Sequence, residues 1–154
     1  MTAHTPSASA VETTHLVLPP DTNSHGTAFG GRVMQWMDIA AGICAGRHSG
    51  GPVVTAAVDN LEFSCPIRGG DVVIIKAATN FTGTTSMEVG VRVETEDART
   101  RTLRHCLTGY FTFVAVDDGG RPVPVRPLVP ETEHDKRRFE KAKARREARL
   151  SKRT

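Results

Sequence analysis

The residues best suited to chemistry lie close together near the N-terminus, where a polar loop leads into an apolar segment. Residues 21–31 read DTNSHGTAFGG, and residues 32–38 read RVMQWMD and bring in one carboxylate, Asp38. An ionised carboxylate in apolar surroundings is costly unless it is paired or hydrogen-bonded, so we expect Asp38 to be used. Gly30 and Gly31 would begin a helix whose first backbone N–H groups are free and favour negative charge. A carboxylate and a donor-rich helix start are the parts of a hydrolytic site.

The hydrophobic pattern predicts the elements that must hold these residues. Residues 30–47 are apolar on nearly every side, which predicts a buried helix, and the Gly and Pro residues of 49–52 end it. Strands are expected over 11–18, 53–64, 71–81, 87–94 and 103–116, followed by a charged helix over about 131–150. The link between residues 81 and 86 is too short for a crossover, so its flanking strands should form an antiparallel hairpin. This order predicts an α+β fold, in which a long helix and a curved antiparallel sheet bury each other.

The chain divides into three parts by composition. Its 154 residues suit one domain with a real core. Residues 1–10 are expected to be a disordered leader, 11–126 the folded domain, and 127–154 a basic linker and helix. Residues 131–154 contain ten Lys or Arg and five Asp or Glu, whereas the rest of the chain contains ten and twelve. The basic character therefore belongs to the C-terminal segment.

The cysteines indicate a reducing environment. Cys44, Cys65 and Cys106 are odd in number, widely spaced and without a CxxC pair, which argues against a disulfide framework and against a zinc site. No secretory signal is visible in residues 1–10, and no apolar run approaches the ~18 residues of a membrane span. We expect a soluble cytoplasmic protein with no bound metal.

Three segments carry a resemblance to a known family. PPDTNSHGTAFGGRVMQWMDIAAG, the later DNLEFSCPIRGGDVV and the hairpin FTGTTSMEVGVRV occur in order within residues 11–126. They resemble the hotdog-fold acyl-CoA thioesterases of the YciA and brain acyl-CoA hydrolase group. The resemblance implies hydrolysis of acyl-CoA at the interface of a dimer, often assembled further as a trimer of dimers.

The resemblance also implies roles for individual residues. Asp38 matches the family's general base or nucleophile, and Gly30 and Gly31 match the helix start whose N–H groups polarise the thioester carbonyl. Asn23 matches a polar loop position that orients the thioester or the water. Thr27 is a departure, because relatives often have Asn or Asp there, and it would offer a shorter contact.

The part that binds coenzyme A is expected on the hairpin and on a nearby turn. Residues Gly83, Thr84, Thr85 and Ser86 match a family segment close to the reacting end and the pantetheine. Arg68 is a candidate for the phosphates of coenzyme A, since arginine forms charge-assisted bonds to phosphate. No cofactor is expected beyond the coenzyme A of the substrate, and neither a membrane nor a nucleic acid is an expected partner.

Several alternatives stay open at this stage. Asp38 could activate water or attack the carbonyl to form a mixed anhydride. The basic C-terminal segment could be a solvated or packed helix, a coenzyme A contact or, less in keeping with its few aromatics, a nucleic-acid contact. A non-catalytic acyl-CoA sensor on the same fold is the main alternative function. A hotdog dehydratase would need a His near the central helix, which offers none before His48.

Overall fold

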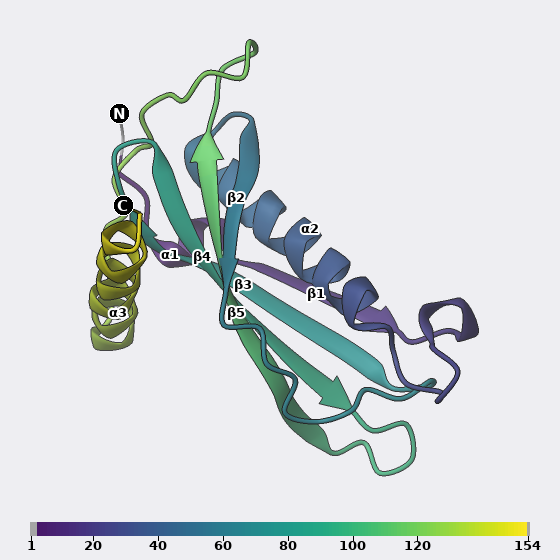
Figure 1. The fold of residues 1–154 in the computed structure, drawn as a ribbon. Helices are drawn as coiled ribbons and strands as arrows, with labels where there is room; N and C mark the ends of the chain where they lie inside the picture. Colours follow the sequence, from purple (N-terminus) through teal and green to yellow (C-terminus); the bar gives the residue numbers. More distant parts are fainter. Residues whose placement is uncertain (1–2, 154) are drawn as a thin grey trace.

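The computed structural model describes residues 3–153, and it contains a curved sheet with a long helix on one side and the C-terminal helix on the other (Figure 1). The elements in chain order are α1 (Pro6–Ser9), β1 (Val11–Leu16), a 3₁₀ turn (Pro19–Asp21), α2 (Gly30–Ser49), β2 (Val53–Asp59), β3 (Val72–Thr82), β4 (Ser86–Glu96), β5 (Leu103–Ala115) and α3 (Glu133–Ser151).

The sheet is antiparallel throughout and has five strands in the order β1-β3-β4-β5-β2. The expected hairpin is confirmed, because β3 and β4 pair antiparallel with Thr82 opposite Met87. The alternating pattern of β4 is confirmed as well: Val89, Val91 and Val93 are fully buried beneath α2. The expected α+β class, with a long helix against a curved antiparallel sheet, is therefore confirmed.

Helix α2 buries only one of its faces, which corrects the expectation of a helix buried all round. The buried residues follow a helical stripe: Val33, Met37, Ala40, Ala41, Cys44, Ala45 and His48. On other sides of the same helix, Met34, Ile39 and Ile43 are exposed, Ile39 to 52%. A single sheet can cover only one side of a helix, so the remaining apolar residues need another surface.

The C-terminal end of α2 is closed by a glycine and a buried histidine. Gly50 adopts a φ of 77°, and its N–H donates to the Gly46 carbonyl at 2.8 Å, which is a left-handed helix cap. His48 is fully buried, and its Nε2 donates to the Arg126 carbonyl at 2.9 Å. Burial lowers the pKa of His48 below its usual value. Arg126 in turn donates to Nε2 of His4 at 2.8 Å, so this cluster fastens the N-terminal segment to the end of α2.

The N-terminal segment differs from the disordered leader that we expected. Residues 1 and 2 lie outside the described residues. Within residues 3–10, Pro6 and Ser9 are buried in the short helix α1, and His4 forms a bridge with Leu128. These contacts join the start of the chain to the segment before α3, a long-range pairing that composition alone does not reveal.

The strand expected over residues 53–64 is shorter than predicted. β2 ends at Asp59, and Asn60 takes a left-handed φ of 59° that breaks the extended chain. Residues 60–71 then form a loop, called the β2–β3 loop below, that crosses the start of β5. Among residues 3–153, no helix has both the length and the hydropathy needed to cross a membrane.

Candidate active site

Asp38 lies on α2 where the helix faces the edge strand β2. The carboxylate is half-buried, and its Oδ1 accepts a hydrogen bond from Thr55 Oγ1 at 2.8 Å. The carboxylate is therefore hydrogen-bonded, as its position in an apolar helix requires. The carboxylate does not point into the core, however, but toward β2, which is an edge strand of the sheet.

Thr55 is a functional candidate that the sequence did not reveal. It is a single hydroxyl residue in the strand VVTAAVD, and no local motif connects it to Asp38, which lies 17 positions earlier. The pairing of β2 with β5 shifts register between Thr55 and Ala57, which is the signature of a β-bulge. Bulges re-aim side chains next to functional sites, and this one adjoins the residue that holds Asp38.

The start of α2 presents backbone donors to an open space. Phe29 caps the helix without a side-chain hydrogen bond. Within residues 3–153, the N–H groups of Gly30 and Gly31 have no hydrogen-bond partner. A Cβ atom on Gly31 would meet nothing within 4 Å, and one on Gly30 would lie 3.7 Å from the Phe63 ring. Together with the helix dipole, these donors suit a developing oxyanion.

A pocket of about 400 Å³ lies at this helix start. One wall is Thr27, Ala28 and Gly30, and the other is residues 63–67 of the β2–β3 loop. The loop is joined to the helix start by the Ala28 N–H, which donates to the Ile67 carbonyl at 2.7 Å. The position of the β2–β3 loop therefore determines the shape of this pocket.

Asn23 closes the loop that precedes α2. Its Nδ2 donates to Thr27 Oγ1 at 2.9 Å, and its Oδ1 accepts from the N–H groups of His25 and Thr27 at 2.9 and 3.2 Å. Its contacts are thus those of a turn residue. The hydroxyl of Thr27, which departs from the family pattern, is the acceptor for Asn23.

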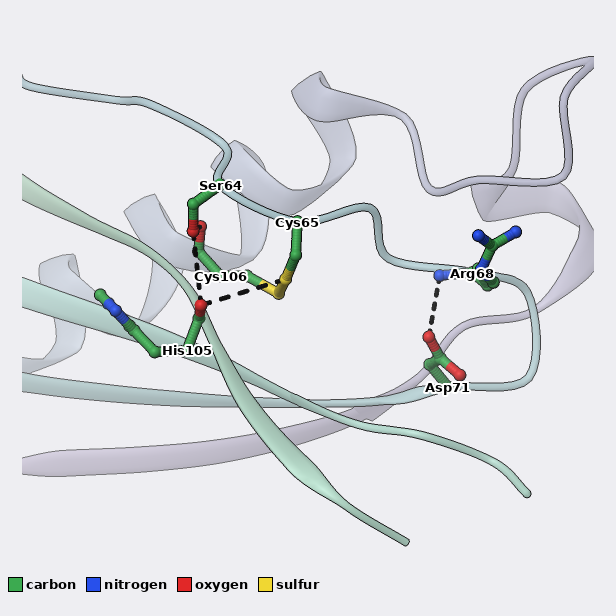
Figure 2. The surroundings of a disulfide bond; sticks show 6 residues. All are labelled: Ser64, Cys65, Arg68, Asp71, His105 and Cys106. Carbon is green, nitrogen blue, oxygen red and sulfur yellow. Dashed lines mark hydrogen bonds between the residues drawn. A yellow bond between two sulfur atoms is a disulfide. The ribbon is translucent and has the colours of Figure 1, made fainter. Parts of the chain in front are cut away.

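Arg68 lies at the same end of the molecule. Its backbone forms a bridge with Thr27, and its N–H donates to Asp71 Oδ2 at 2.9 Å, while its side chain is exposed (Figure 2). The structure thus gathers Asn23, Gly30, Gly31 and Arg68 around the start of α2.

The hairpin of Gly83, Thr84, Thr85 and Ser86 lies near the opposite end of α2. Ser86 of β4 pairs with Val114 of β5, and Val114 pairs on its other side with Val54 of β2. Val54 follows the end of α2 closely in the chain, so the hairpin lies near that end. The Val125 N–H donates to the Thr84 carbonyl at 2.8 Å. A Cβ atom on Gly83 would lie 3.4 Å from Arg146 Nε, so α3 contacts this hairpin. One chain therefore does not bring the hairpin together with Gly30 and Gly31.

The C-terminal helix α3 packs on the face of the sheet opposite α2 (Figure 1). Arg145 donates from Nε and Nη2 to the Glu88 carboxylate at 2.9 and 2.8 Å, and its guanidinium lies 3.6 Å from the Tyr110 ring centroid. Asn80 Nδ2 donates to Glu88 at 3.0 Å. The Asn80 side chain fits because residue 90 is glycine. A Cβ atom at that position would lie 2.5 Å from Asn80 Nδ2. Of the readings left open for the tail, the structure therefore shows a packed helix.

The cysteines correct the sequence-based expectation. Cys65 of the β2–β3 loop and Cys106 of β5 form a disulfide (Figure 2), and Cys44 is a buried free thiol. The pair is 41 positions apart, and only the crossing of the loop over β5 brings the Cα atoms to 5.2 Å. As for metals, the described part of the chain contains no group of three or more His, Cys, Asp or Glu suited to hold one.

Comparison with known proteins identifies the family of this chain. The model of the thioesterase superfamily matches residues 25–102, which span the start of α2, Asp38, Thr55 and the hairpin. The chain belongs to this superfamily. A relative from Bacillus subtilis, named as an uncharacterized acyl-CoA thioester hydrolase, is 43% identical over 82% of this chain and 74% of its own length. The human cytosolic acyl coenzyme A thioester hydrolase is 42% identical over 85% of this chain, which spans about a third (35%) of that longer protein.

Solved structures confirm the hotdog fold of this thioesterase-superfamily chain. The acyl-CoA hydrolase of Staphylococcus aureus, in complex with butyryl coenzyme A, coenzyme A and coenzyme A disulfide, superposes with a TM-score of 0.91. The two sequences are 37% identical, and the match covers 99% of this chain and 93% of the S. aureus chain. An apo-hexameric acyl-CoA thioesterase gives a TM-score of 0.93 at 39% identity, over 98% of this chain and 97% of that one. The S. aureus enzyme has also been solved with one Asn, one Asp or one Thr replaced by alanine. The resemblance drawn from the sequence is confirmed.

Proposed function

We propose that this protein is an acyl-CoA thioesterase, which hydrolyses acyl-CoA to a carboxylic acid and coenzyme A. The observation that carries the proposal is the half-buried Asp38 of a thioesterase-superfamily fold, whose carboxylate accepts a hydrogen bond from Thr55 of the edge strand β2. The Thr55 hydroxyl occupies Oδ1 of Asp38, which leaves Oδ2 to take a proton from water or to attack the carbonyl. Thr55 is a positioning residue in this scheme. Asn, Asp and Thr are also the residue types replaced in the S. aureus variants.

The thioester carbonyl is assigned to the start of α2. Gly30 lines the open pocket there and Gly31 follows it in the first turn, and each N–H donor to an oxyanion is worth about 10²–10³ in rate. Asn23 acts at the same end, through the loop that it closes before the helix or by orienting the thioester or water. Arg68 and the hairpin of residues 83–86 are assigned to the coenzyme A part of the substrate. No further cofactor, metal, membrane or nucleic acid takes part.

The distance along α2 favours a site shared by two chains. Gly30 and Asp38 are eight positions apart, which is about 12 Å of helix, so we infer that one chain does not offer both to the same thioester. β2 is an open edge strand, and α2 and β2 carry several exposed apolar side chains: Ile39, Ile43, Val54 and Val58. Pairing of two copies along this surface would cover them and join Asp38 of one copy to the helix start of the other. A trimer of such dimers agrees with the hexameric relative of known structure. The cytosolic relative favours a cytoplasmic location.

The decisive experiment replaces Asp38 by Asn and measures thiol release from acyl-CoAs with acyl chains from acetyl to palmitoyl. We expect kcat to fall by about 10²–10⁴-fold at an unchanged oligomeric state, because the base or nucleophile is lost. Asp118→Asn is the matched control, since Asp118 is exposed in the turn after β5 and should leave turnover unchanged. An assembled Asp38→Asn variant with wild-type turnover would refute the mechanism. A wild-type protein that binds acyl-CoA without hydrolysis would instead support the sensor.

A further inference from the structure

The Cys65–Cys106 disulfide lies in the wall of the pocket at the start of α2. Cys65 lines this pocket together with Phe63, Ser64 and other residues of the β2–β3 loop, and Cys106 anchors the bond on β5. The disulfide therefore connects the pocket wall to the sheet.

Few other contacts hold the middle of the β2–β3 loop. The N–H and the hydroxyl of Ser64 both donate to the Cys106 carbonyl, at 2.9 and 2.7 Å. The hydroxyl also lies 3.4 Å from the His105 carbonyl (Figure 2). The next attachments lie further along the loop, where Ile67 accepts from the Ala28 N–H and where Asp71 accepts from the Arg68 N–H. The side chains of Glu62, Phe63 and Ser64 are exposed. The disulfide and Ser64 thus fix the segment that contains Phe63.

The two cysteine residues differ in exposure. Cys106 is fully buried in the core, whereas Cys65 is half-buried and lines the pocket. An incoming thiolate can therefore reach the sulfur of Cys65 from the pocket, and Cys106 is the leaving group. Thiol–disulfide exchange depends on this kind of access.

We propose that Cys65–Cys106 is a thiol–disulfide exchange site for small thiols. The thiolate of a small thiol attacks Cys65 Sγ and forms a mixed disulfide there. The Cys65–Cys106 bond breaks, and its electron pair leaves on Cys106, which takes a proton from solvent. A second molecule of the same thiol attacks the mixed disulfide, restores the Cys65 thiol and leaves as the small-molecule disulfide. The reverse sequence, with that small disulfide as oxidant, closes the bond again.

The exchange controls the pocket. With the bond closed, the β2–β3 loop holds Phe63 beside Gly30. With the bond open, the only hydrogen bonds that join residues 62–64 to the rest of the described chain are those of Ser64. Reduction therefore weakens substrate binding, a consequence that rests on the proposed function. In a cytosol that keeps most thiols reduced, the state of this bond would follow the local balance of thiol and disulfide.

The test equilibrates the purified protein at a series of ratios of reduced to oxidised glutathione. Alkylation of the denatured protein with iodoacetamide, followed by mass spectrometry, should modify Cys44 alone at the oxidised end and all three cysteines at the reduced end. Hydrogen exchange of residues 60–71 should be faster in the reduced form. Cys65→Ser should show the faster exchange at every ratio, whereas the control Cys44→Ala should respond as the wild type does. Three alkylated cysteines at every ratio, or equal exchange of the loop in both forms, would overturn the proposal.

Hydrolysis gives an independent readout. Reduction should raise KM for acyl-CoA by about three- to tenfold, the range that ordering one loop side chain costs, with kcat unchanged. An unchanged KM contradicts the control of the pocket. If the protein hydrolyses no acyl-CoA in either form, the proposed function fails, and the alkylation and exchange measurements still decide the exchange site.

Discussion

Replacement of Arg145 by Met should loosen the packing of the C-terminal helix on the sheet and destabilise the protein. Arg145 forms a bidentate ion pair with Glu88, whose side chain is only 7% exposed, while that of Arg145 is 21% exposed. The substitution keeps most of the side-chain volume and removes the charge. The Glu88 carboxyl group would then lie beneath α3 without its ion-pair partner, and Asn80 would be its only remaining hydrogen-bond donor within the described residues.

The expected cost follows from the burial of the pair. Removal of one partner of a buried ion pair costs about 3–5 kcal/mol. We expect about 3 kcal/mol for this pair, because Arg145 is partly exposed and α3 can lift away, which lets water reach Glu88. The other contacts of α3 with the sheet limit this movement: Phe139 packs edge-on against Phe81, and Ala142 is buried. For a chain of this length the loss corresponds to a fall in Tm of about 6–12 °C.

Urea unfolding at one fixed protein concentration measures the free energy, and hydrogen exchange locates the change. Lys136→Met is the matched control, since its ion pair with Glu133 is exposed and should contribute no more than about 0.5 kcal/mol. The double variant Glu88→Gln with Arg145→Met removes the buried charge and should recover at least part of the loss. If Arg145→Met were as stable as Lys136→Met, or if the double variant were no more stable than Arg145→Met, the reasoning would be refuted.

Two further predictions concern the site and its support. Thr55→Val should lower kcat/KM for acyl-CoA by about 10–100-fold, because the carboxylate of Asp38 loses a hydrogen bond worth about 1.5–3 kcal/mol, and Thr55→Ser should restore most of it. Equal activity of the Val and Ser variants would remove the positioning role. His48 is buried and its pKa is lowered by burial, so the unfolded chain binds more protons as the pH falls below 6.5. The free energy of unfolding should therefore decrease as the pH is lowered below 6.5, by at most about 1.4 kcal/mol per pH unit from this group. The decrease should be smaller in His48→Gln. An identical pH dependence of the two proteins would contradict the assignment.

The regular elements were predictable from the sequence, since they depend on local periodicity. The alternation in β4 and the apolar run of α2 gave both elements close to their observed bounds. The end of β2 was not predictable in this way, because the apolar pattern continues to Phe63 while the backbone turns at Asn60. The exposed side of α2 was missed for a related reason: an apolar residue in a helix has the same sequence signature whether its own sheet or a second chain covers it.

Some residues of the candidate site could likewise be predicted from the sequence, and others only from the tertiary structure. The residues by themselves made Asp38, Gly30 and Gly31 candidates for a hydrolytic site, and the thioester followed only from the family resemblance, so their roles stay predictions. Tertiary structure alone brought Thr55 to Asp38, paired Cys65 with Cys106 and placed Arg145 on Glu88. Each of these contacts joins residues that are far apart in the chain, and strand register, a β-bulge or the path of a loop decides whether they meet.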